Sequence, residues 1–172
     1  MKKLKLGMVG GGQGAFIGGV HRIAARMDDR WELVSGALSS NKERAKLSAD
    51  ELGLVRSYSS FEEMAKVESS LEDGIDAVSI VTPNNVHSAP VIAFLNAGIH
   101  VICDKPLAAT MEQANQISES VEKSEARFFL THNYTAYPLI RQAQKLVKEG
   151  ALGRIRVVQS EYVQDWLTNE TS

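Results

Sequence analysis

The sequence predicts an α/β fold built on a doubly wound, mostly parallel sheet, and three observations support this prediction. Short apolar runs alternate with amphipathic helical segments along most of the chain. A glycine-rich stretch at residues 10–15 joins the first apolar run to the first helical segment. A continuous β-branched run at 76–81 is typical of a strand that is buried on both faces. Such alternation favours a parallel sheet with ligands at the carboxyl ends of its strands.

Composition limits the class of protein. The 172 residues are 44% hydrophobic and 23% charged, with a net charge of −2, which predicts a globular chain of one domain or slightly more. The near-neutral charge gives no footprint for nucleic acid, and no apolar run is long enough to span a membrane. We therefore expect a cytoplasmic protein without a nucleic-acid or membrane partner. The single cysteine, Cys103, excludes an intrachain disulfide, and it forms no metal-ligand spacing with the four histidines, so we expect no metal site.

The glycine-rich stretch is the first functional signal. Gly10-x-Gly12-x-x-Ala15, placed between a strand and a helix, matches the dinucleotide fingerprint of Rossmann folds. Glycine permits positive φ and lets a pyrophosphate approach the backbone, while the following helix N-terminus favours negative charge. The alternative interpretation is an ordinary glycine-rich turn.

The first half of the chain predicts three strand–helix units. Strands are expected at 4–9, 31–38 and 55–58. In the first helix Phe16, Val20, Ile23, Ala24 and Met27 recur with the spacing of one apolar face. Capping boxes predict helix starts at Ser40, with Glu43, and at Ser60, with Glu63; the first of these helices should close at Gly53 and the second near Leu71.

The second half continues the alternation. Strands are expected at 76–81, 99–103 and 127–131. Between them, one helix should be capped by Ser88 and end at Gly98, and another should run from Thr110, with Gln113, to near Glu125. A further helix carries Ile140, Ala143, Leu146 and Val147 and stops at Gly150.

The last segment differs from the rest. Residues 154–163 predict a long strand, and the nine residues after it are too few to supply a covering layer. We therefore expect a Rossmann domain over residues 1–153 and, over 154–172, only the first strand of a second α+β domain. Such an edge should pair across a subunit interface or make the isolated chain prone to aggregation.

Several strand-end motifs together resemble the Gfo/Idh/MocA family of sugar and cyclitol oxidoreductases. The stretch 10–18 with His21 resembles the extended glycine loop of one branch, and the stretch 82–87 resembles the family's TPNxxH motif. Asp104-Lys105-Pro106 resembles its EKP motif, and 151–155 is similar to the LGxI sequence that leads into its second domain. The resemblance covers nearly the whole chain.

The resemblance implies an NAD(P)-dependent enzyme that moves hydride between the nicotinamide and a secondary alcohol or ketone of a polyol or sugar. Lys105 is the implied catalytic residue, because an ammonium at the sheet's carboxyl edge can hold a substrate oxygen and stabilise developing negative charge. Taken alone, Asp-Lys-Pro is also common as a solvated turn. Relatives often carry this Lys-Pro peptide in the cis form, and we expect the same here.

The histidines have structural and functional interpretations. By resemblance, His87 passes near the nicotinamide ribose, yet we favour a structural role in which its ring bonds nearby backbone. His21 should pack within the first helix or contact the glycine loop from behind. After the sixth strand, the family often carries Asn followed by arginines, whereas Tyr134 and Thr135 follow Asn133 in this chain. Asn133 and Tyr137 remain candidates to line the pocket.

The cofactor prediction rests on the end of the second strand, where NAD-preferring folds place an acidic residue. Here Ser39, Ser40 and Asn41 stand at that position, and Lys42 and Arg44 follow. These cations can pair with a 2′-phosphate, which favours NADP over NAD. The alternative interpretation is that both are exposed helix residues near an N-terminus. The predicted cofactor-binding residues are Gly10, Gly12, Gln13, Gly14, Ala15, Phe16, Ile17, Ser39, Ser40, Arg44, Thr82, Pro83, Asn84, His87, Asp104, Lys105 and Asn133.

Three functional classes stay open. In the family, a second domain supplies most of the substrate pocket and a proton-transferring histidine, so this chain is expected to be the inactive cofactor-binding part of a longer enzyme. With that domain present, we expect a homo-oligomer. The alternative is a stand-alone dinucleotide-binding module, which the end of the sequence at Ser172 would favour. A methyltransferase that binds S-adenosylmethionine is disfavoured because no acidic residue follows the second strand.

Overall fold

The computed structural model describes residues 2–165, which form two compact units that divide between His132 and Asn133. The first unit contains one six-stranded sheet in the order β3-β2-β1-β4-β5-β6. Every neighbouring pair of strands is parallel. This arrangement confirms the predicted doubly wound α/β fold, while the predicted domain boundary at residue 153 stays a prediction.

The strands lie where the apolar runs predicted them. All five residues of β4 are buried, as expected for a strand covered on both faces. The strands are β1 (Leu4–Gly10), β2 (Trp31–Ala37), β3 (Arg56–Ser57), β4 (Ala77–Val81), β5 (His100–Cys103) and β6 (Phe128–Leu130).

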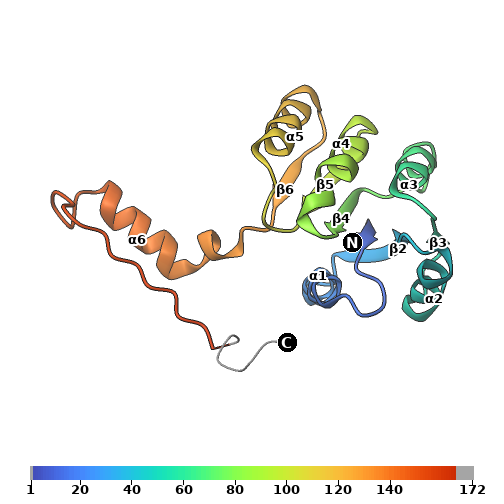
Figure 1. Cartoon of the computed structure of the whole chain (residues 1–172), viewed down its shortest axis with the longest axis horizontal. Coiled ribbons are helices and arrows are strands. Elements are labelled where there is room, and N and C mark those ends of the chain that lie inside the picture. The colour runs from blue at the N-terminus through green and yellow to red at the C-terminus, as the bar shows by residue number, and fades with distance from the viewer. Residues whose placement is uncertain (1, 166–172) are drawn as a thin grey trace. The chain divides into compact units, whose positions relative to one another are not determined.

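Helices cover both faces of the sheet. Figure 1 shows α1 and α2 on one side and α3, α4 and α5 on the other. The helices of this unit are α1 (Phe16–Met27), α2 (Lys42–Leu52), α3 (Phe61–Glu68), α4 (Ser88–Asn96) and α5 (Met111–Lys123), with a 3₁₀ turn, η1 (Asn84–Val86), before α4. None of the helices in the described part of the chain is long and apolar enough to cross a membrane.

Local signals set several helix ends as predicted. The Ser60 hydroxyl accepts a hydrogen bond from the Glu63 amide at 3.2 Å, and the Thr110 hydroxyl accepts one from the Gln113 amide at 3.2 Å. Gly53 closes α2 with a left-handed φ of 64°. These caps satisfy amide groups that the helix leaves unpaired.

Three helix ends differ from the prediction. The cap of α2 is Asn41 rather than Ser40, because the Asn41 side chain accepts from the Arg44 amide at 2.9 Å. Ser88 is the first residue of α4 rather than its cap, because His87, which follows η1, already has a helical backbone conformation. Helix α3 ends at Glu68, short of Leu71.

The apolar face predicted for α1 points away from the sheet. Phe16, Val20, Ile23 and Met27 are 84%, 41%, 60% and 78% exposed. The helix instead turns Gly18 inward, where a Cβ would lie 2.5 Å from the Cα of Gly11. The close approach of the glycine loop therefore sets which face is buried, and apolar spacing alone does not reveal that direction.

The core lies mainly on the side of α3, α4 and α5. There, Met64, Phe94 and Ile117 pack in a large cluster against the sheet. The cluster on the side of α1 and α2 is small and contains Met8, Leu38, Ala49 and Val81. This asymmetry agrees with the outward direction of the apolar stripe on α1.

The second unit is described over residues 133–165. It contains a 3₁₀ turn, η2 (Asn133–Ala136), and α6 (Pro138–Lys148). The hydroxyl groups of Tyr134 and Tyr162 hydrogen bond at 2.8 Å. The strand predicted at 154–163 is wrong for this structure, because those residues form no strand. A strand needs a neighbour to accept its hydrogen bonds, and the described residues of this unit contain none.

A buried ion pair holds the short strand β3 to α3. The Glu68 side chain is 1% exposed and accepts from Nε and Nη2 of Arg56 at 2.8 and 2.9 Å. It also accepts from the Tyr58 hydroxyl at 2.8 Å. Burial acts to raise the pKa of Glu68, but hydrogen bonds from Arg56 and Tyr58 outweigh it and hold that pKa below its usual value. Burial and Glu68 together raise the pKa of Tyr58 to about 12.

Removing the Glu68 carboxylate should strongly destabilise the first unit. We expect Glu68→Ala to lower the free energy of unfolding by roughly 3–5 kcal/mol, because it removes the buried partner of Arg56 and leaves that charge only the exposed Asp73 carboxylate. Glu62→Ala, at an exposed position of the same helix, should change it by less than about 0.5 kcal/mol. Urea unfolding followed by circular dichroism measures both, and equal effects would contradict the role of the ion pair.

The same pair predicts an acid dependence. Because the folded-state pKa of Glu68 is lowered, its stabilisation is complete above the unfolded pKa of roughly 4.3 and disappears as pH falls through the folded-state value. The difference in unfolding free energy between the wild type and Glu68→Gln should therefore be constant above about pH 6 and shrink below about pH 4. A difference that grows on acidification would show that this sign is wrong.

Candidate functional site

The glycine loop after β1 is shaped by both conformation and crowding. Gly10, Gly11 and Gly14 have φ values of 77°, 74° and 77°, in the left-handed region that favours glycine. A Cβ on Gly10 would lie 2.9 Å from Cγ2 of Thr82, and one on Gly12 would lie 2.8 Å from the Leu38 carbonyl oxygen. Close packing against neighbouring residues therefore requires glycine at both positions.

Neighbouring elements hold this loop in place. The Gln13 amide donates to the Ser48 hydroxyl on α2 at 3.0 Å. The Arg22 guanidinium on α1 donates to the Gly11 carbonyl at 2.7 Å, and burial lowers the pKa of Arg22. Helices α1 and α2 thereby fix the loop before any ligand arrives, which reduces the conformational entropy lost on binding.

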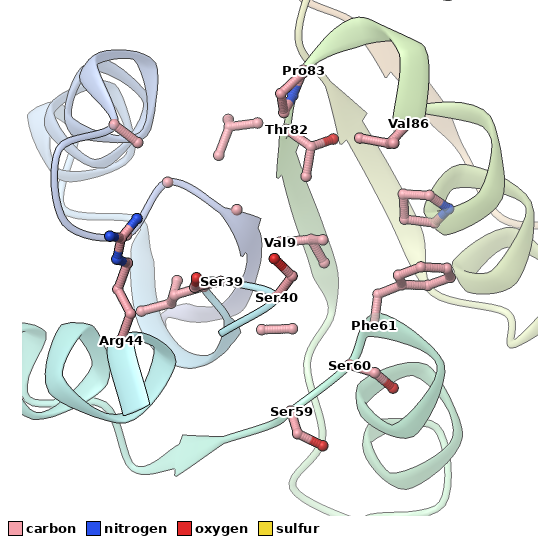
Figure 2. Close-up of a pocket in the computed structure, with 18 of the residues that line it drawn as sticks. Val9, Ser39, Ser40, Arg44, Ser59, Ser60, Phe61, Thr82, Pro83 and Val86 are labelled. Atoms are coloured by element: carbon pink, nitrogen blue, oxygen red, sulfur yellow. The ribbon is translucent and has the colours of Figure 1, made fainter. Parts of the chain in front are cut away.

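A cleft of about 580 Å³ opens beside the loop at the carboxyl edge of the sheet. This volume lies within the range of small-molecule sites. In Figure 2, Ser39, Ser40 and Arg44 lie on one side of the cleft, and Thr82, Pro83 and Val86 lie on the other. The lining residues are Val9, Gly10, Gly11, Gly12, Gln13, Ala15, Ala37, Leu38, Ser39, Ser40, Arg44, Ser59, Ser60, Phe61, Glu62, Val81, Thr82, Pro83, Val86 and Pro90.

Two polar groups in this cleft lack protein partners. The Thr82 hydroxyl is buried and has no hydrogen-bond partner among residues 2–165. Arg44 forms no salt bridge within that described range. Buried polar groups are usually paired, and a guanidinium binds phosphate or carboxylate. The cleft therefore offers a hydroxyl and a cation to a polar, anionic ligand.

The predicted cofactor residues divide by location. Gly10, Gly12, Gln13, Ala15, Ser39, Ser40, Arg44, Thr82 and Pro83 line the cleft. Gly14 and Phe16 line a smaller hollow of about 290 Å³ that shares loop residues with the cleft, and Ile17 packs against the small core cluster. Asn84 is exposed in η1, and Asn133 and Tyr137 belong to the second unit.

The sequence interpretation missed part of the lining. Four residues between the end of β3 and the first turn of α3 line the cleft, namely Ser59, Ser60, Phe61 and Glu62. The sequence predicts only a helix cap for Ser60. Their position after a strand was the available signal, because the carboxyl ends of parallel strands meet at one edge.

Lys105 follows β5 at this edge and has an exposed side chain. The Lys105–Pro106 peptide is cis, as the resemblance implied. The carbonyl of Pro106 faces Nδ1 of His87 at 3.0 Å, and Nε2 of the same ring faces the Thr82 carbonyl at 2.8 Å. His87 is only 1% exposed. The structural interpretation of His87 is confirmed: its ring joins the Thr82 turn to the Lys105 turn.

Asp104, the residue before Lys105, is also held by side-chain contacts. Asp104 Oδ1 accepts from the Thr131 hydroxyl at 2.8 Å and faces Nε2 of His21 at 3.3 Å. Nδ1 of His21 lies 2.8 Å from the Ser79 hydroxyl on β4. His21 therefore points inward from α1, and its polar partners are Ser79 on β4 and Asp104 after β5, which neither predicted role named.

Cys103 is a packed apolar side chain rather than a nucleophile. It is fully buried, and burial, together with the neighbouring Asp104 carboxylate, raises the pKa of its thiol to about 12. Over residues 2–165, no three His, Cys, Asp or Glu side chains gather where they could hold a metal ion.

Comparison with known proteins connects this geometry to a family. Residues 4–132 match the Gfo/Idh/MocA model, described as an oxidoreductase family with an NAD-binding Rossmann fold. Levoglucosan dehydrogenase from Pseudarthrobacter phenanthrenivorans is 32% identical over 180 residues, covering 100% of this chain and 44% of that protein. D-xylose 1-dehydrogenase (NADP(+)) 2 from Haloferax volcanii is 33% identical over 129 residues, covering 74% and 38%.

Solved structures agree with these relatives. An oxidoreductase from Sinorhizobium meliloti superposes with a TM-score of 0.90 at 56% identity, covering 98% of this chain and 47% of that one. An inositol dehydrogenase homologue from Azotobacter vinelandii, solved with NAD⁺, superposes with a TM-score of 0.83 at 37% identity, covering 90% and 40%. The chain thus spans less than half the length of these proteins. It belongs to the Gfo/Idh/MocA family of oxidoreductases, whose NAD-binding Rossmann fold it carries.

Proposed function

We propose that this chain is the cofactor-binding part of an oxidoreductase that transfers hydride between a nicotinamide dinucleotide and a sugar, inositol or related polyol or ketone. The observation that carries the proposal is the cleft at the carboxyl edge, where left-handed glycines, the unpaired Thr82 hydroxyl and Arg44 surround one space. The names of the relatives, levoglucosan dehydrogenase and D-xylose 1-dehydrogenase, support a sugar-like substrate.

The residues present fit a dinucleotide. The glycine loop offers close backbone approach to a pyrophosphate, and the unpaired Thr82 hydroxyl offers a hydrogen bond to a polar ligand. Bound there, the nicotinamide would supply the hydride acceptor or donor. Lys105, exposed at the same edge, would hold the substrate oxygen and stabilise the negative charge that develops on it.

NADP is the cofactor that we favour. Ser39 and Ser40 line the cleft where NAD-preferring folds place a carboxylate, and Arg44 follows on α2 without an acidic partner in the described chain. A relative named as NADP-dependent supports this choice, whereas the Azotobacter vinelandii homologue was solved with NAD⁺. The expectation of a homo-oligomer stays a prediction.

Cofactor preference can be measured on the chain itself. We expect NADPH to bind more tightly than NADH in a fluorescence titration. Arg44→Ala should raise the Kd for NADPH about tenfold and change that for NADH little, since a hydrogen bond to a charged group contributes roughly 1.5 kcal/mol. Lys46→Ala removes the same charge from an exposed position on the same helix that does not line the cleft, and is the matched control. Tighter binding of NADH would contradict the preference for NADP.

Turnover distinguishes an enzyme from a stand-alone binding module, the second candidate. We would join residues 1–153 to the second domain of the Sinorhizobium meliloti relative and assay a panel of sugars and inositols. In an active chimera, Lys105→Ala should lower kcat by roughly a hundredfold with little change in cofactor Kd, because a donor to the developing charge acts in the transition state. Lys66→Ala serves as a surface control. Cofactor binding without turnover on any substrate would favour the module.

A further inference from the structure

A network of hydrogen-bonded polar side chains connects four elements next to Lys105. It runs from Ser79 on β4 to His21 on α1, then to Asp104 after β5 and Thr131 after β6, at 2.8, 3.3 and 2.8 Å. The side chains of His21 and Asp104 are 11% and 14% exposed, and Ser79 is 1% exposed. An unpaired polar group in such a place costs roughly 1–3 kcal/mol, so the four groups depend on one another.

Donor and acceptor chemistry fixes which atoms of this polar network carry the hydrogens. The Asp104 carboxylate only accepts hydrogen bonds, so the Thr131 hydroxyl donates to it and Nε2 of His21 must carry a hydrogen. In the neutral ring, Nδ1 then accepts from the Ser79 hydroxyl. Among the neutral forms of the ring, the geometry thus selects the Nε2–H tautomer of His21.

This network fixes Asp104, the residue directly before Lys105. The Asp104 amide donates to the Ile80 carbonyl at 2.9 Å, so both its backbone and its side chain are held. On the other side of Lys105, the Pro106 carbonyl meets the buried ring of His87. Lys105 itself is exposed between these two anchored neighbours. Its direction is therefore set by Asp104 and Pro106 rather than by contacts of its own ammonium.

We propose that His21 is a positioning residue for Lys105, acting through Asp104. This inference rests on the proposed function only for the use of Lys105, because the anchoring itself requires no cofactor. His21 lies 83 residues from Asp104 in the sequence and couples the helix that follows the glycine loop to the turn that carries the lysine. The dinucleotide side and the substrate side of the site are joined by this contact.

Two conservative variants separate positioning from simple packing. The amide nitrogen of a glutamine can occupy the place of Nε2, the atom that faces Asp104, whereas an asparagine can reach only the place of Nδ1, the atom that faces Ser79. His21→Gln should therefore keep the anchor on Asp104, and His21→Asn should lose it. Because asparagine is also smaller and a weaker helix former than glutamine, Thr131→Val, which leaves α1 unchanged, is the variant that separates loss of the anchor from loss of packing.

The readout is the reactivity of Lys105 in the cofactor-free chain. Limited acetylation with acetic anhydride, followed by mass spectrometry, gives the rate at Lys105 relative to the exposed Lys66 in each variant. We expect a rate increase of at least about twofold in His21→Asn, as the turn loosens and the ammonium samples more of the solvent, and a rate close to wild type in His21→Gln. An unchanged rate in His21→Asn, or equal rates in the two variants, would overturn the proposal.

Two further measurements cover the case in which His21→Asn fails to fold. Thr131→Val keeps the side-chain shape but removes the other donor to Asp104, and it should raise the Lys105 rate in the same direction; no change would overturn the proposal. Nitrogen-15 NMR of the wild type should show His21 as the Nε2–H tautomer, and the Nδ1–H tautomer would also overturn it. Neither test needs a bound cofactor, so failure of cofactor binding in the titration and failure of this inference are separate results.

Discussion

The parallel register of β1, β4 and β5 is the constraint on which the candidate site depends. Gly10 pairs with Val81, and Ile80 pairs with Cys103, so the residues that follow these strands meet at one edge. The glycine loop, the Thr82 turn and the Lys105 turn are far apart in sequence and become neighbours only through this register. A shift of one residue in either pair would reverse the faces of a buried strand, and the cleft would lose its lining.

At that edge, the conformation of the backbone decides what can bind. The left-handed glycines allow close approach on the side of the cleft, while the Ser48 and Arg22 side chains hold the loop from behind. The turns opposite are held by His87 and by the Asp104 contacts. Most polar groups here hold the scaffold, and only a few, such as the Thr82 hydroxyl and Arg44, remain for a ligand.

The sequence predicted what local chemistry and burial decide. The sheet and the caps at Ser60 and Thr110 follow from short-range patterns, and the structure confirms these elements. Nine of the twenty residues that line the cleft are also among the predicted cofactor-binding residues, whose role stays a prediction. The outward direction of the apolar face of α1 is not predictable from residue spacing, because periodicity does not show which neighbour a helix face meets. The partners of His21 lie 58 and 83 residues away, and a strand at 154–163 requires pairing that no local pattern reveals. Long-range contact explains each failure.

The burial of Cys103 has a practical consequence. The chain contains one cysteine, which is 0% exposed and whose thiol has a pKa raised to about 12. At neutral pH this thiol is protonated and shielded from solvent, so alkylating dyes should not react with it. Cysteines introduced on the surface would then be the only attachment points for fluorophores or spin labels. With one such cysteine on each side of the carboxyl edge, spectroscopic distances across that edge could be measured without first engineering a cysteine-free background.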